Sequence, residues 1–580
     1  MFKKLLVANR GEIAVRVIRG CRDLDIETVA VYSDLDADAV HTRLADEAYN
    51  VGPGPANQSY LVVANILEAA RRSGAEAVHP GYGFLAENAG FAQAVIDAGL
   101  VWVGPSPEVI EGMGEKTSAR RAATEAGVAT VPGTAEPVTS AAEVMDFVSQ
   151  YGLPLAIKAS AGGGGKGFRV VKEANEVEDA LAGAAREAEA YFSNAEVYLE
   201  RYLERPRHIE VQVMGAATGE IISFPERDCS LQRRHQKLVE ESPSPALDNG
   251  VREAIMAAAA KVSKQVGYRN AGTCEFLLDS DGKTFYFLEM NTRLQVEHPV
   301  TELVTGIDLV KSQLVVAAGE ALDYGQADIQ LKGHAIECRV NAENAAKNFM
   351  PAPGRIGAYR EPAGPGVRVD SGTEGNSEIP QAYDPLVSKV ISYGADREEA
   401  RRRMLRALSE YEVQGIKTTI PFHRLMLSDE RFVSGDYHTG TVEREMDLSV
   451  LKEQVEPKPK VGEPTVASRE LAVEVDGKRF AVRIREHLEE TIRPKKPRPP
   501  ERAASLGGGG SEELIAPMQG TIVKVLVDKG SSVKPGDAIC VLEAMKMENS
   551  ILAHTEGTVE ELKVAAGQPV ETGATIAIIR

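Results

Sequence analysis

The chain has 580 residues, of which 43% are hydrophobic, 26% charged and 5% aromatic. These proportions are typical of globular proteins, so they exclude a wholly disordered or collagen-like chain, and the length predicts roughly four domains. The 66 basic and 85 acidic residues give a net charge of −19, which excludes a nucleic-acid coat. We therefore expect no nucleic-acid partner.

Membrane insertion and secretion are not expected either. No apolar run approaches the ~18 residues of a membrane helix, and the apolar part of the first ten residues is too short for a secretory signal. The cysteines are few, odd in number and widely spaced, without a CxxC pair, which favours free thiols in a reducing cytoplasm over disulfides or a zinc site. These are Cys21, Cys229, Cys274, Cys338 and Cys540.

Strand and helix patterns alternate over the first ~110 residues. Apolar runs predict strands over 4–8, 28–32, 75–79 and 100–104, and helical spacing of apolar residues predicts a helix over 11–24. This pattern predicts a parallel sheet covered by helices. Residues up to ~335 mix strands, hairpins and helices, and shorter elements with a helix over 397–408 follow up to ~446.

The composition changes from about residue 451. A proline- and charge-rich stretch is followed by a hairpin predicted over 471–484, which turns on Asp476-Gly477. Residues 491–513 contain four prolines, basic residues and the run Gly507–Gly510, so they are predicted to be a flexible linker. Such a linker has an r.m.s. reach of about 27 Å.

The last ~70 residues contain an internal repeat. Gly520-Thr521, Gly530, Val533, Gly536 and Ile539 recur 37 residues later as Gly557-Thr558, Gly567, Val570, Gly573 and Ile576. The repeat predicts an all-β sandwich of two similar ribbons with pseudo-twofold symmetry. Lys546 lies in the segment that joins the two copies, where a hairpin tip is expected.

A second glycine run, Gly162–Gly165, lies between two predicted strands and is bordered by Lys158 and Lys166. Glycines there allow the backbone to fold over an anion and present its N–H groups. The segment is not a P-loop, because no Ser or Thr follows Lys166 and a strand comes next. A mobile phosphate-binding lid is favoured; a static structural turn is the alternative.

Glu275 and Glu289 lie seven residues either side of Gly282, on two predicted strands. An odd-numbered loop centred there would place the carboxylates opposite each other, whereas a two-residue Asp281-Gly282 turn would put them on opposite faces. Opposed carboxylates suit an Mg²⁺ or Mn²⁺ ion, with Asn291 as a further oxygen ligand. The alternative is one solvated glutamate and one paired with arginine.

Two polar segments flank this region, 226–237 and 293–299. A charge-rich stretch is usually a solvated face. Beside the glycine run and the carboxylate pair, however, these segments become candidate phosphate- and anion-binding residues.

These motifs together resemble a known family. Residues 1–446 are similar to the biotin carboxylases of the ATP-grasp superfamily. The motifs that carry this resemblance are the glycine run, the stretch 79–84 (HPGYGF), the stretch 227–230 (RDCS) and the stretch 289–293 (EMNTR). The sequence Ala544-Met545-Lys546-Met547 resembles the attachment site of biotin carrier domains. The whole chain resembles α subunits of bacterial acyl-CoA carboxylases, of the acetyl- or propionyl-CoA type.

The resemblance implies an α/β and α+β multidomain fold that ends in an all-β biotinyl (lipoyl-like) sandwich. The expected parts are a Rossmann-like N-terminal domain (1–114), an ATP-grasp domain (115–334) with a mobile lid (about 132–203), a C-terminal carboxylase domain (335–446), a small partner-docking segment (447–490), the linker (491–513) and the carrier domain (514–580). A linker hairpin without a partner is the alternative for the docking segment.

The resemblance also assigns roles to residues. Biotin would be held covalently on Lys546, Glu297 would be the general base, and Arg339 would stabilise the biotin enolate. ATP would be bound by Lys116, Lys158, Gly164, Gly165, Glu200, Leu203, His208, Gln232, His235, Glu275 and Glu289; Mg²⁺ or Mn²⁺ by Glu275, Glu289 and Asn291; and bicarbonate by Lys237, Arg293, Gln295, Val296 and Glu297. Lys237 and Arg293 would also be catalytic.

The implied reaction is carboxylation of the chain's own biotin with ATP and bicarbonate through carboxyphosphate. Phosphoryl transfer needs charge neutralisation and positioning, which explains the lysines and the metal pair. About 67 residues separate the carboxylase from the carrier, too few for a carboxyltransferase. The carboxybiotin is therefore expected to go to a separate carboxyltransferase β subunit that makes malonyl-CoA or methylmalonyl-CoA, in an α/β hetero-oligomer (α6β6 by resemblance), after a biotin protein ligase has loaded Lys546.

Three alternatives stay open. One is a subunit of a related carboxylase of the pyruvate or methylcrotonyl-CoA type, another is a different ATP-grasp ligase, and the last is a carrier protein with an inactive scaffold. One departure concerns the dimer interface: Pro365 stands where many relatives have an aromatic residue, although Arg16, Arg19 and Arg368 are present. The resemblance therefore predicts the active site and leaves the mode of dimerisation open.

Overall fold

The computed structural model describes residues 1–134, 136–159, 168–192, 196–451, 466–475, 478–487, 513–517, 519–544, 547–571 and 573–580. They form two units, Met1–Val450 and Leu451–Arg580. Of the helices that these ranges contain, none combines the length and the apolar character that a bilayer crossing requires.

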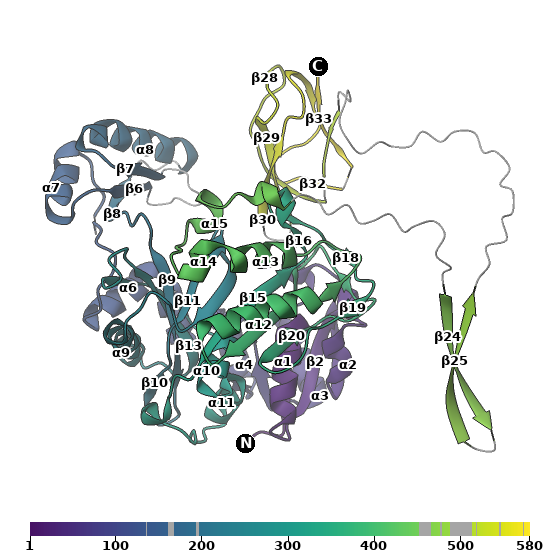
Figure 1. The fold of residues 1–580 in the computed structure, drawn as a ribbon. Coiled ribbons are helices and arrows are strands. Elements are labelled where there is room, and N and C mark those ends of the chain that lie inside the picture. Colours follow the sequence, from purple (N-terminus) through teal and green to yellow (C-terminus); the bar gives the residue numbers. More distant parts are fainter. Residues whose placement is uncertain are drawn as a thin grey trace, which may run out of the picture. The chain divides into compact units, whose positions relative to one another are not determined.

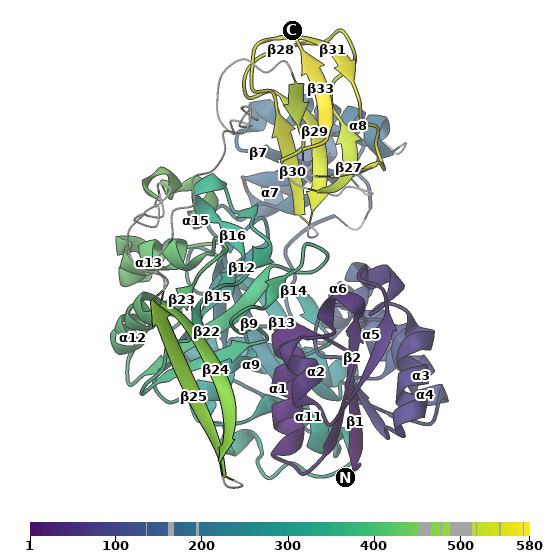
Figure 2. The ribbon, with the colours of Figure 1, turned by 90° about the vertical axis from the view of Figure 1, so that its right-hand side faces the viewer.

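The first unit begins with a parallel five-stranded sheet of order β3-β2-β1-β4-β5. Leu5 and Val7 of β1 face a core shared with α1 and α11, whereas Leu6 faces a core shared with α3 and α4. Figure 2 shows these helices on the two sides of the strands. The elements are β1 (Lys4–Val7), α1 (Gly11–Arg22), β2 (Glu27–Ser33), α2 (Val40–Leu44), β3 (Glu47–Gly52), α3 (Val63–Ser73), β4 (Ala77–His79), α4 (Ala89–Asp97), β5 (Val101–Trp102) and α5 (Pro107–Gly114). The predicted parallel sheet covered by helices is confirmed, and helices cover both of its faces.

A second, larger sheet carries the polar residues of the candidate site. Its order is β14-β13-β9-β11-β12-β15-β22-β20, with β10 paired to β9; of these strands, Figure 1 labels β9, β10, β11, β13, β15 and β20. The strands are β9 (Arg207–Gly215), β10 (Ile221–Ser223), β11 (Arg227–Arg233), β12 (Gln236–Ser242), β13 (Asn270–Leu278), β14 (Phe285–Asn291), β15 (His334–Asn341), β20 (Val367–Ser371) and β22 (Leu386–Gly394).

Alternation along these strands separates an apolar face from a polar face. On β9 and β13, Val211 and Phe276 pack against Ile255 of α9, while Glu210 and Glu275 point to the other side. Helix α12 packs against β22 and β15, and Figure 2 shows it beside these two strands. The helices around the sheet are α6 (Lys116–Glu125), α9 (Asn249–Gln265), α10 (His298–Thr305), α11 (Leu309–Ala317), α12 (Arg397–Glu410), α13 (Ile420–Ser428), α14 (Glu430–Ser434) and α15 (Thr441–Arg444).

The predicted lid region forms a small α/β element with its own core. Leu155 and Ile157 of its central strand pack with Val144 and Val197. It consists of α7 (Ala141–Tyr151), β6 (Leu155–Ala159), β7 (Phe168–Val171), α8 (Val177–Phe192) and β8 (Val197–Arg201), in the strand order β7-β6-β8. Gly162–Gly165 lie outside the described residues, so lid motion stays a prediction.

Short two-stranded ribbons complete the first unit. They pair β16 (Glu343–Asn344) with β17 (Met350–Pro351), β18 (Gly354–Arg355) with β21 (Glu378–Ile379), and β19 (Tyr359–Arg360) with β23 (Glu412–Val413).

The second unit contains the predicted hairpin and the predicted sandwich. The hairpin pairs β24 (Val466–Val475) with β25 (Lys478–His487), so its strands extend beyond the predicted limits. The sandwich has two four-stranded sheets, β26-β33-β31-β28 and β30-β29-β27-β32. Its strands are β26 (Glu513–Ile515), β27 (Gly520–Val525), β28 (Ser532–Val533), β29 (Ala538–Ala544), β30 (Met547–Leu552), β31 (Gly557–Leu562), β32 (Pro569–Val570) and β33 (Thr575–Ile579).

The sequence repeat is visible in the sandwich as equivalent strands. Strands β27 and β31 start at matching repeat positions, Gly520 and Gly557, and each lies between two strands of its own sheet. The repeated glycines Gly530 and Gly567 both have positive φ values, of 92° and 83°. The two-ribbon architecture is confirmed.

Candidate active site

Lys237, on β12, lies at the centre of the polar face. Its ammonium group binds three carboxylates, Oε2 of Glu210 at 2.5 Å, Oε1 of Glu275 at 2.9 Å and Oε1 of Glu297 at 2.6 Å. Burial alone would lower the pKa of Lys237, but the three carboxylates raise it well above its ordinary value. Lys237 is therefore a fixed cation that holds together carboxylates from three other segments of the chain.

A tight turn sets the position of Lys237. Arg233 pairs with Gln236, so Arg234 and His235 form a two-residue connection between β11 and β12, and both have positive φ values. This geometry matches the twist of paired strands, but it is uncommon for residues other than glycine. The turn pairs Gln232 with Lys237 across the ladder.

Glu297 is fully buried at the N-terminal end of α10 and receives hydrogen bonds on both oxygens. Lys237 binds Oε1, and the guanidinium of Arg339, on β15, donates to Oε2 at 2.9 Å. Although burial would raise it, the pKa of Glu297 is held well below its ordinary value by Lys237, Arg339 and Arg227. Glu297 is therefore ionised, as a base must be before it accepts a proton.

A buried arginine, Arg227 on β11, supports this cluster from inside the sheet. It is 0% exposed and donates to Oε1 of Glu210 at 2.5 Å, to Oε1 of Gln212 at 3.0 Å and to the hydroxyl groups of Thr273 and Thr301 at 3.1 and 2.9 Å. Glu210 is thus held between Arg227 and Lys237.

The predicted metal pair, Glu275 and Glu289, lies face to face across the β13–β14 ladder. The predicted cause, an odd-numbered loop, is wrong. Leu278 pairs with Phe285, which leaves a six-residue connection, and a bulge at Leu288 then shifts the register by one residue. The bulge therefore brings Glu289 opposite Glu275.

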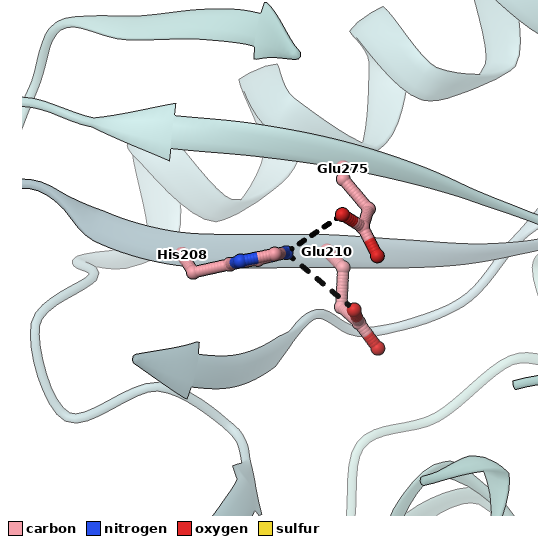
Figure 3. Close-up of side chains that lie close together, drawn as sticks. All are labelled: His208, Glu210 and Glu275. Atoms are coloured by element: carbon pink, nitrogen blue, oxygen red, sulfur yellow. Dashed lines mark ion pairs between the residues drawn. The ribbon is translucent and has the colours of Figure 1, made fainter. Parts of the chain in front are cut away.

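The surroundings of Glu275 fit a hard divalent ion. His208 lies with Nε2 at 3.0 Å from Oε2 of Glu275 and at 3.8 Å from Oε2 of Glu210, and Figure 3 shows the imidazole directed at both carboxylates. The ligand atoms of these three residues lie within 4.8 Å of one another. Burial opposes ionisation, but Lys237 and His208 hold the pKa of Glu275 well below its ordinary range. Ionised, closely spaced carboxylates are the donors that Mg²⁺ or Mn²⁺ prefers.

Arg293 connects the metal pair to the rest of the site. It donates to Oδ1 of Asn291 at 3.1 Å, to Oε1 of Gln295 at 3.0 Å and to Oε2 of Glu87 at 2.9 Å. Gln295 in turn donates to Oε1 of Glu275 at 3.1 Å. The carbonyl of Val296, the next residue, accepts a hydrogen bond of 2.8 Å from the buried Lys389.

The predicted nucleotide-binding residues are distributed over the lid element and the polar face. Lys158 of β6 forms an ion pair with Glu200 of β8. Leu203, His208 and Gln232 are buried, and His235 is exposed. Lys116 begins α6, whereas Gly164, Gly165 and Lys546 lie outside the described residues.

The attachment lysine can be located only through its neighbours. Ala544, at the end of β29, pairs with Met547, at the start of β30. Met545 and Lys546 are the two positions between these paired residues. The prediction that two paired strands flank Lys546 is confirmed.

Sequence reasoning missed several residues of the cluster, chiefly Glu210, Glu240 and Lys389. Glu210 carried a usable signal, because His208, Glu210 and Gln212 alternate with apolar residues along one strand. Lys389 carried none, since only the fold of β22 beside β15 brings it next to the site.

Four family models match the chain in succession. They are the N-terminal domain of biotin carboxylase (residues 1–110), the ATP-binding domain of the carbamoyl-phosphate synthase L chain (115–324), the C-terminal domain of biotin carboxylase (337–444) and the biotin-requiring enzyme model (512–579). The biotin-dependent acyl-coenzyme A carboxylase alpha3 subunit of Mycobacterium leprae is 48% identical over 592 residues, covering 100% of this chain and 98% of the relative. The chain belongs to the alpha subunits of biotin-dependent acyl-CoA carboxylases.

Other relatives of this carboxylase cover its first three quarters. Biotin carboxylase 1 of Bacillus subtilis is 52% identical over 76% of the chain and 98% of the relative. The biotin carboxylase of Haemophilus influenzae is 48% identical over 77% of the chain and 100% of the relative. Together with the biotin-requiring enzyme model over residues 512–579, these matches support the predicted biotin carboxylase fused to a biotin carrier.

Solved structures agree with this assignment. The biotin carboxylase domain of a thermophilic 2-oxoglutarate carboxylase bound to ADP has a TM-score of 0.73 at 46% identity, covering 76% of this chain and 98% of that one. The corresponding domain of Hydrogenobacter thermophilus, in complex with MgADP and bicarbonate, has a TM-score of 0.69 at 46% identity, covering 76% and 97%. This protein is thus an enzyme that carboxylates biotin and uses ATP, Mg²⁺ and covalent biotin.

Proposed function

We propose that this chain is the alpha subunit of an acyl-CoA carboxylase that carboxylates biotin on its own Lys546 and delivers it to a separate carboxyltransferase β subunit. The full-length similarity to an acyl-CoA carboxylase of the same type supports this proposal, because it includes the carrier region. Malonyl-CoA or methylmalonyl-CoA is the proposed product. The α6β6 assembly, the biotin protein ligase and the six predicted domain limits belong to the same proposal.

The observation that carries the chemistry is the Lys237 cluster. Lys237, Arg293 and Gln295 are proposed to bind bicarbonate together with the backbone of Val296. Arrival of this anion draws the ammonium of Lys237 away from the Glu297 carboxylate, to which it now binds at 2.6 Å. Losing part of its positive surroundings raises the pKa of Glu297, and the carboxylate then removes the bicarbonate proton.

The nucleotide is proposed to bind along the face that leads from Lys116, Lys158 and the lid glycines to the Glu275–Glu289 pair. A divalent ion at Glu275, Glu289 and Asn291 would neutralise phosphate charge during phosphoryl transfer. Glu200, Leu203, His208, Gln232 and His235 are proposed to line the nucleotide site.

Arg339 is proposed to act at the biotin ring. Its guanidinium is fixed by Glu240 and Glu297 on one side of the site. There it offers positive charge to the ring oxygen of biotin while the neighbouring nitrogen is carboxylated.

We propose that the protein works in the cytoplasm. Its five cysteines are all free and buried, as a reducing compartment allows.

The proposal is tested in two steps. First, the chain purified without covalent biotin should hydrolyse ATP only when both bicarbonate and free biotin are present. Second, the co-purified partner should be screened with acetyl-, propionyl- and longer acyl-CoAs and with pyruvate. Carboxylation of pyruvate alone would support the pyruvate carboxylase alternative, and ATPase activity without bicarbonate would contradict the carboxylase role.

A further inference from the structure

Two acidic residues next to the site, Glu240 and Glu337, form a buried pair to which the proposed reaction assigns no proton transfer. They are partners across the β12–β15 ladder, and both are 0% exposed. Like charges directly opposite each other destabilise a sheet, and an unpaired buried charge is costly. In the described part of the chain, Oε2 of Glu240 and both carboxylate oxygens of Glu337 have no hydrogen-bond partner.

The charges around the pair do not compensate two carboxylates. The charged groups that act on the pair are Lys237 on β12, Arg339 on β15, Lys389 on β22 and Glu297 before α10. Lys389 in turn interacts with Glu12 on α1 and with Asp370 and Arg368 on β20. The three cations that act on the pair are shared with Glu297, Glu12 and Asp370. Burial accordingly raises the pKa of Glu240 to about 7 and that of Glu337 well above its ordinary value.

Arg339 links this pair to Glu297. One guanidinium nitrogen lies 2.6 Å from Oε1 of Glu240 and 2.9 Å from Oε2 of Glu297. These two distances limit the separation of the two carboxylate oxygens to about 5.5 Å, which one bridging water molecule spans with two hydrogen bonds.

The other end of the pair leads to a cavity. Lys389 is fully buried on the same sheet face as Arg339 and Glu337, and its ammonium lies 3.2 Å from Oε1 of Glu12. Glu12 lines a cavity of about 490 Å³ between the N-terminal sheet and the segment 372–380. A line of ionisable groups therefore runs from Glu297 to this cavity.

A proton must leave this site in every turnover. Bicarbonate and the biotin nitrogen each lose one proton, and the released phosphate keeps only one of the two. The other proton starts on Glu297, where the surrounding cations disfavour it.

We propose that the Glu240–Glu337 pair accepts the bicarbonate proton from Glu297 and passes it to the cavity at Glu12. The O–H bond of bicarbonate breaks as Glu297 becomes a carboxylic acid; that acid then returns to a carboxylate as Glu240 takes up the proton. The ammonium of Lys389 donates one of its protons to Glu12, the resulting amine takes the proton of Glu337 in its place, and water removes the proton from Glu12. This inference rests on the proposed role of Glu297 as the base.

The main test uses the full-length Glu337→Gln variant, which keeps the size of the side chain but cannot relay a proton. Carboxylation of free biotin should lose about tenfold or more in kcat, with the KM for bicarbonate and for ATP unchanged. A stopped-flow experiment with a pH-indicator dye should show proton release lagging behind ADP formation, which a structural role alone does not produce.

Glu343 provides the matched control. It is a buried glutamate on β16 whose pKa burial raises to about 7, and the site described above does not include it. Glu343→Gln should leave kcat and the timing of proton release unchanged. Equal kinetics of Glu337→Gln and Glu343→Gln would overturn the inference, whereas an inactive wild type would count against the proposed function instead.

If Glu337→Gln does not fold, the inference can be tested on a protein that keeps both Glu240 and Glu337. In a background with Glu12→Gln, Glu226→Gln and Glu343→Gln, which removes the other buried glutamates whose pKa burial raises, the infrared C=O stretch of a protonated carboxylic acid should be present at pH 7 and shrink as the pH rises to 9. Absence of a titrating buried acid would contradict a proton-holding pair.

Discussion

Glu275 lies directly opposite Glu289 across the β13–β14 ladder, and the pairing depends on one extra residue, Leu288, in β14. Without the bulge, Glu275 would face Leu288, and Glu289 would point toward the α9 side of the sheet. Leu288 therefore acts as the extra residue that shifts the register, and its partly exposed side chain is not needed for the pairing.

The first prediction concerns this pair. Glu289→Gln removes one proposed ligand charge without changing size, so the Mg²⁺ concentration for half-maximal bicarbonate-dependent ATPase should rise at least tenfold (about 1.4 kcal/mol). The measurement is a Mg²⁺ titration at saturating ATP. Leu288→Thr is the matched control on the preceding residue and should leave the titration unchanged; an equal shift in both variants would argue against a metal at Glu289.

The second prediction concerns Lys237. Lys237→Gln leaves Glu210, Glu275 and Glu297 buried around a neutral group, which should cost about 3–5 kcal/mol of stability and abolish bicarbonate-dependent ATPase. In the wild type, Lys237 holds the pKa of Glu297 low. In the variant, protonation of the three carboxylates can remove the repulsion among their buried charges. The stability difference between the two proteins should therefore shrink as the pH falls.

Denaturant unfolding at pH 8 and pH 5.5 measures this difference. A gap that grows toward low pH would contradict the ionised carboxylate cluster.

The third prediction concerns a buried carboxylate away from the site. Glu241 accepts hydrogen bonds from His334 at 2.6 Å, Arg397 at 2.7 Å and Tyr437 at 2.5 Å. Although burial opposes ionisation, His334 and Arg397 lower its pKa to about 2. Because the folded pKa is depressed, this stabilisation is complete above the unfolded value of about 4.5 and is lost as the pH falls toward 2.

Glu241→Gln should thus lower the Tm at pH 7, and the deficit relative to the wild type should diminish in acid. Burial raises the pKa of Glu343 instead of lowering it, so the Tm deficit of Glu343→Gln should not diminish in acid.

The fourth prediction separates the carrier from the carboxylase. Lys546→Arg keeps the positive charge, but the guanidinium stays protonated and should not accept biotin. The variant should lose streptavidin reactivity and acyl-CoA carboxylation with any partner, and should still carboxylate free biotin at the wild-type rate. Loss of free-biotin carboxylation would mean that the two units are not independent modules.

How much could be predicted depended on whether a signal was local. The alternating strands and helices of the first domain, the hairpin with Glu275 and Glu289 and the 37-residue repeat were predicted from periodicity. The cause of the Glu275–Glu289 pairing was not, although Phe285, Phe287 and Met290 face the same core and this break in alternation marks a bulge.

Residues brought in by distant strands could not be predicted in the same way. Both Glu240 and Lys389 take their roles from contact with Arg339. This residue lies about 100 residues from Glu240 and about 50 residues from Lys389 along the chain. Nothing near them in the sequence distinguishes them from the acidic and basic residues of an ordinary exposed strand.

Continuity of the large sheet has a consequence for folding. Strand β12, which carries Lys237, pairs on one side with β11 and on the other with β15, which carries Arg339. A chain shortened to end before residue 335 would leave β12 as an unpaired edge that bears buried charges, and such edges promote aggregation. The ATP-binding and C-terminal regions of the carboxylase should therefore unfold in one cooperative transition, although separate family models match them.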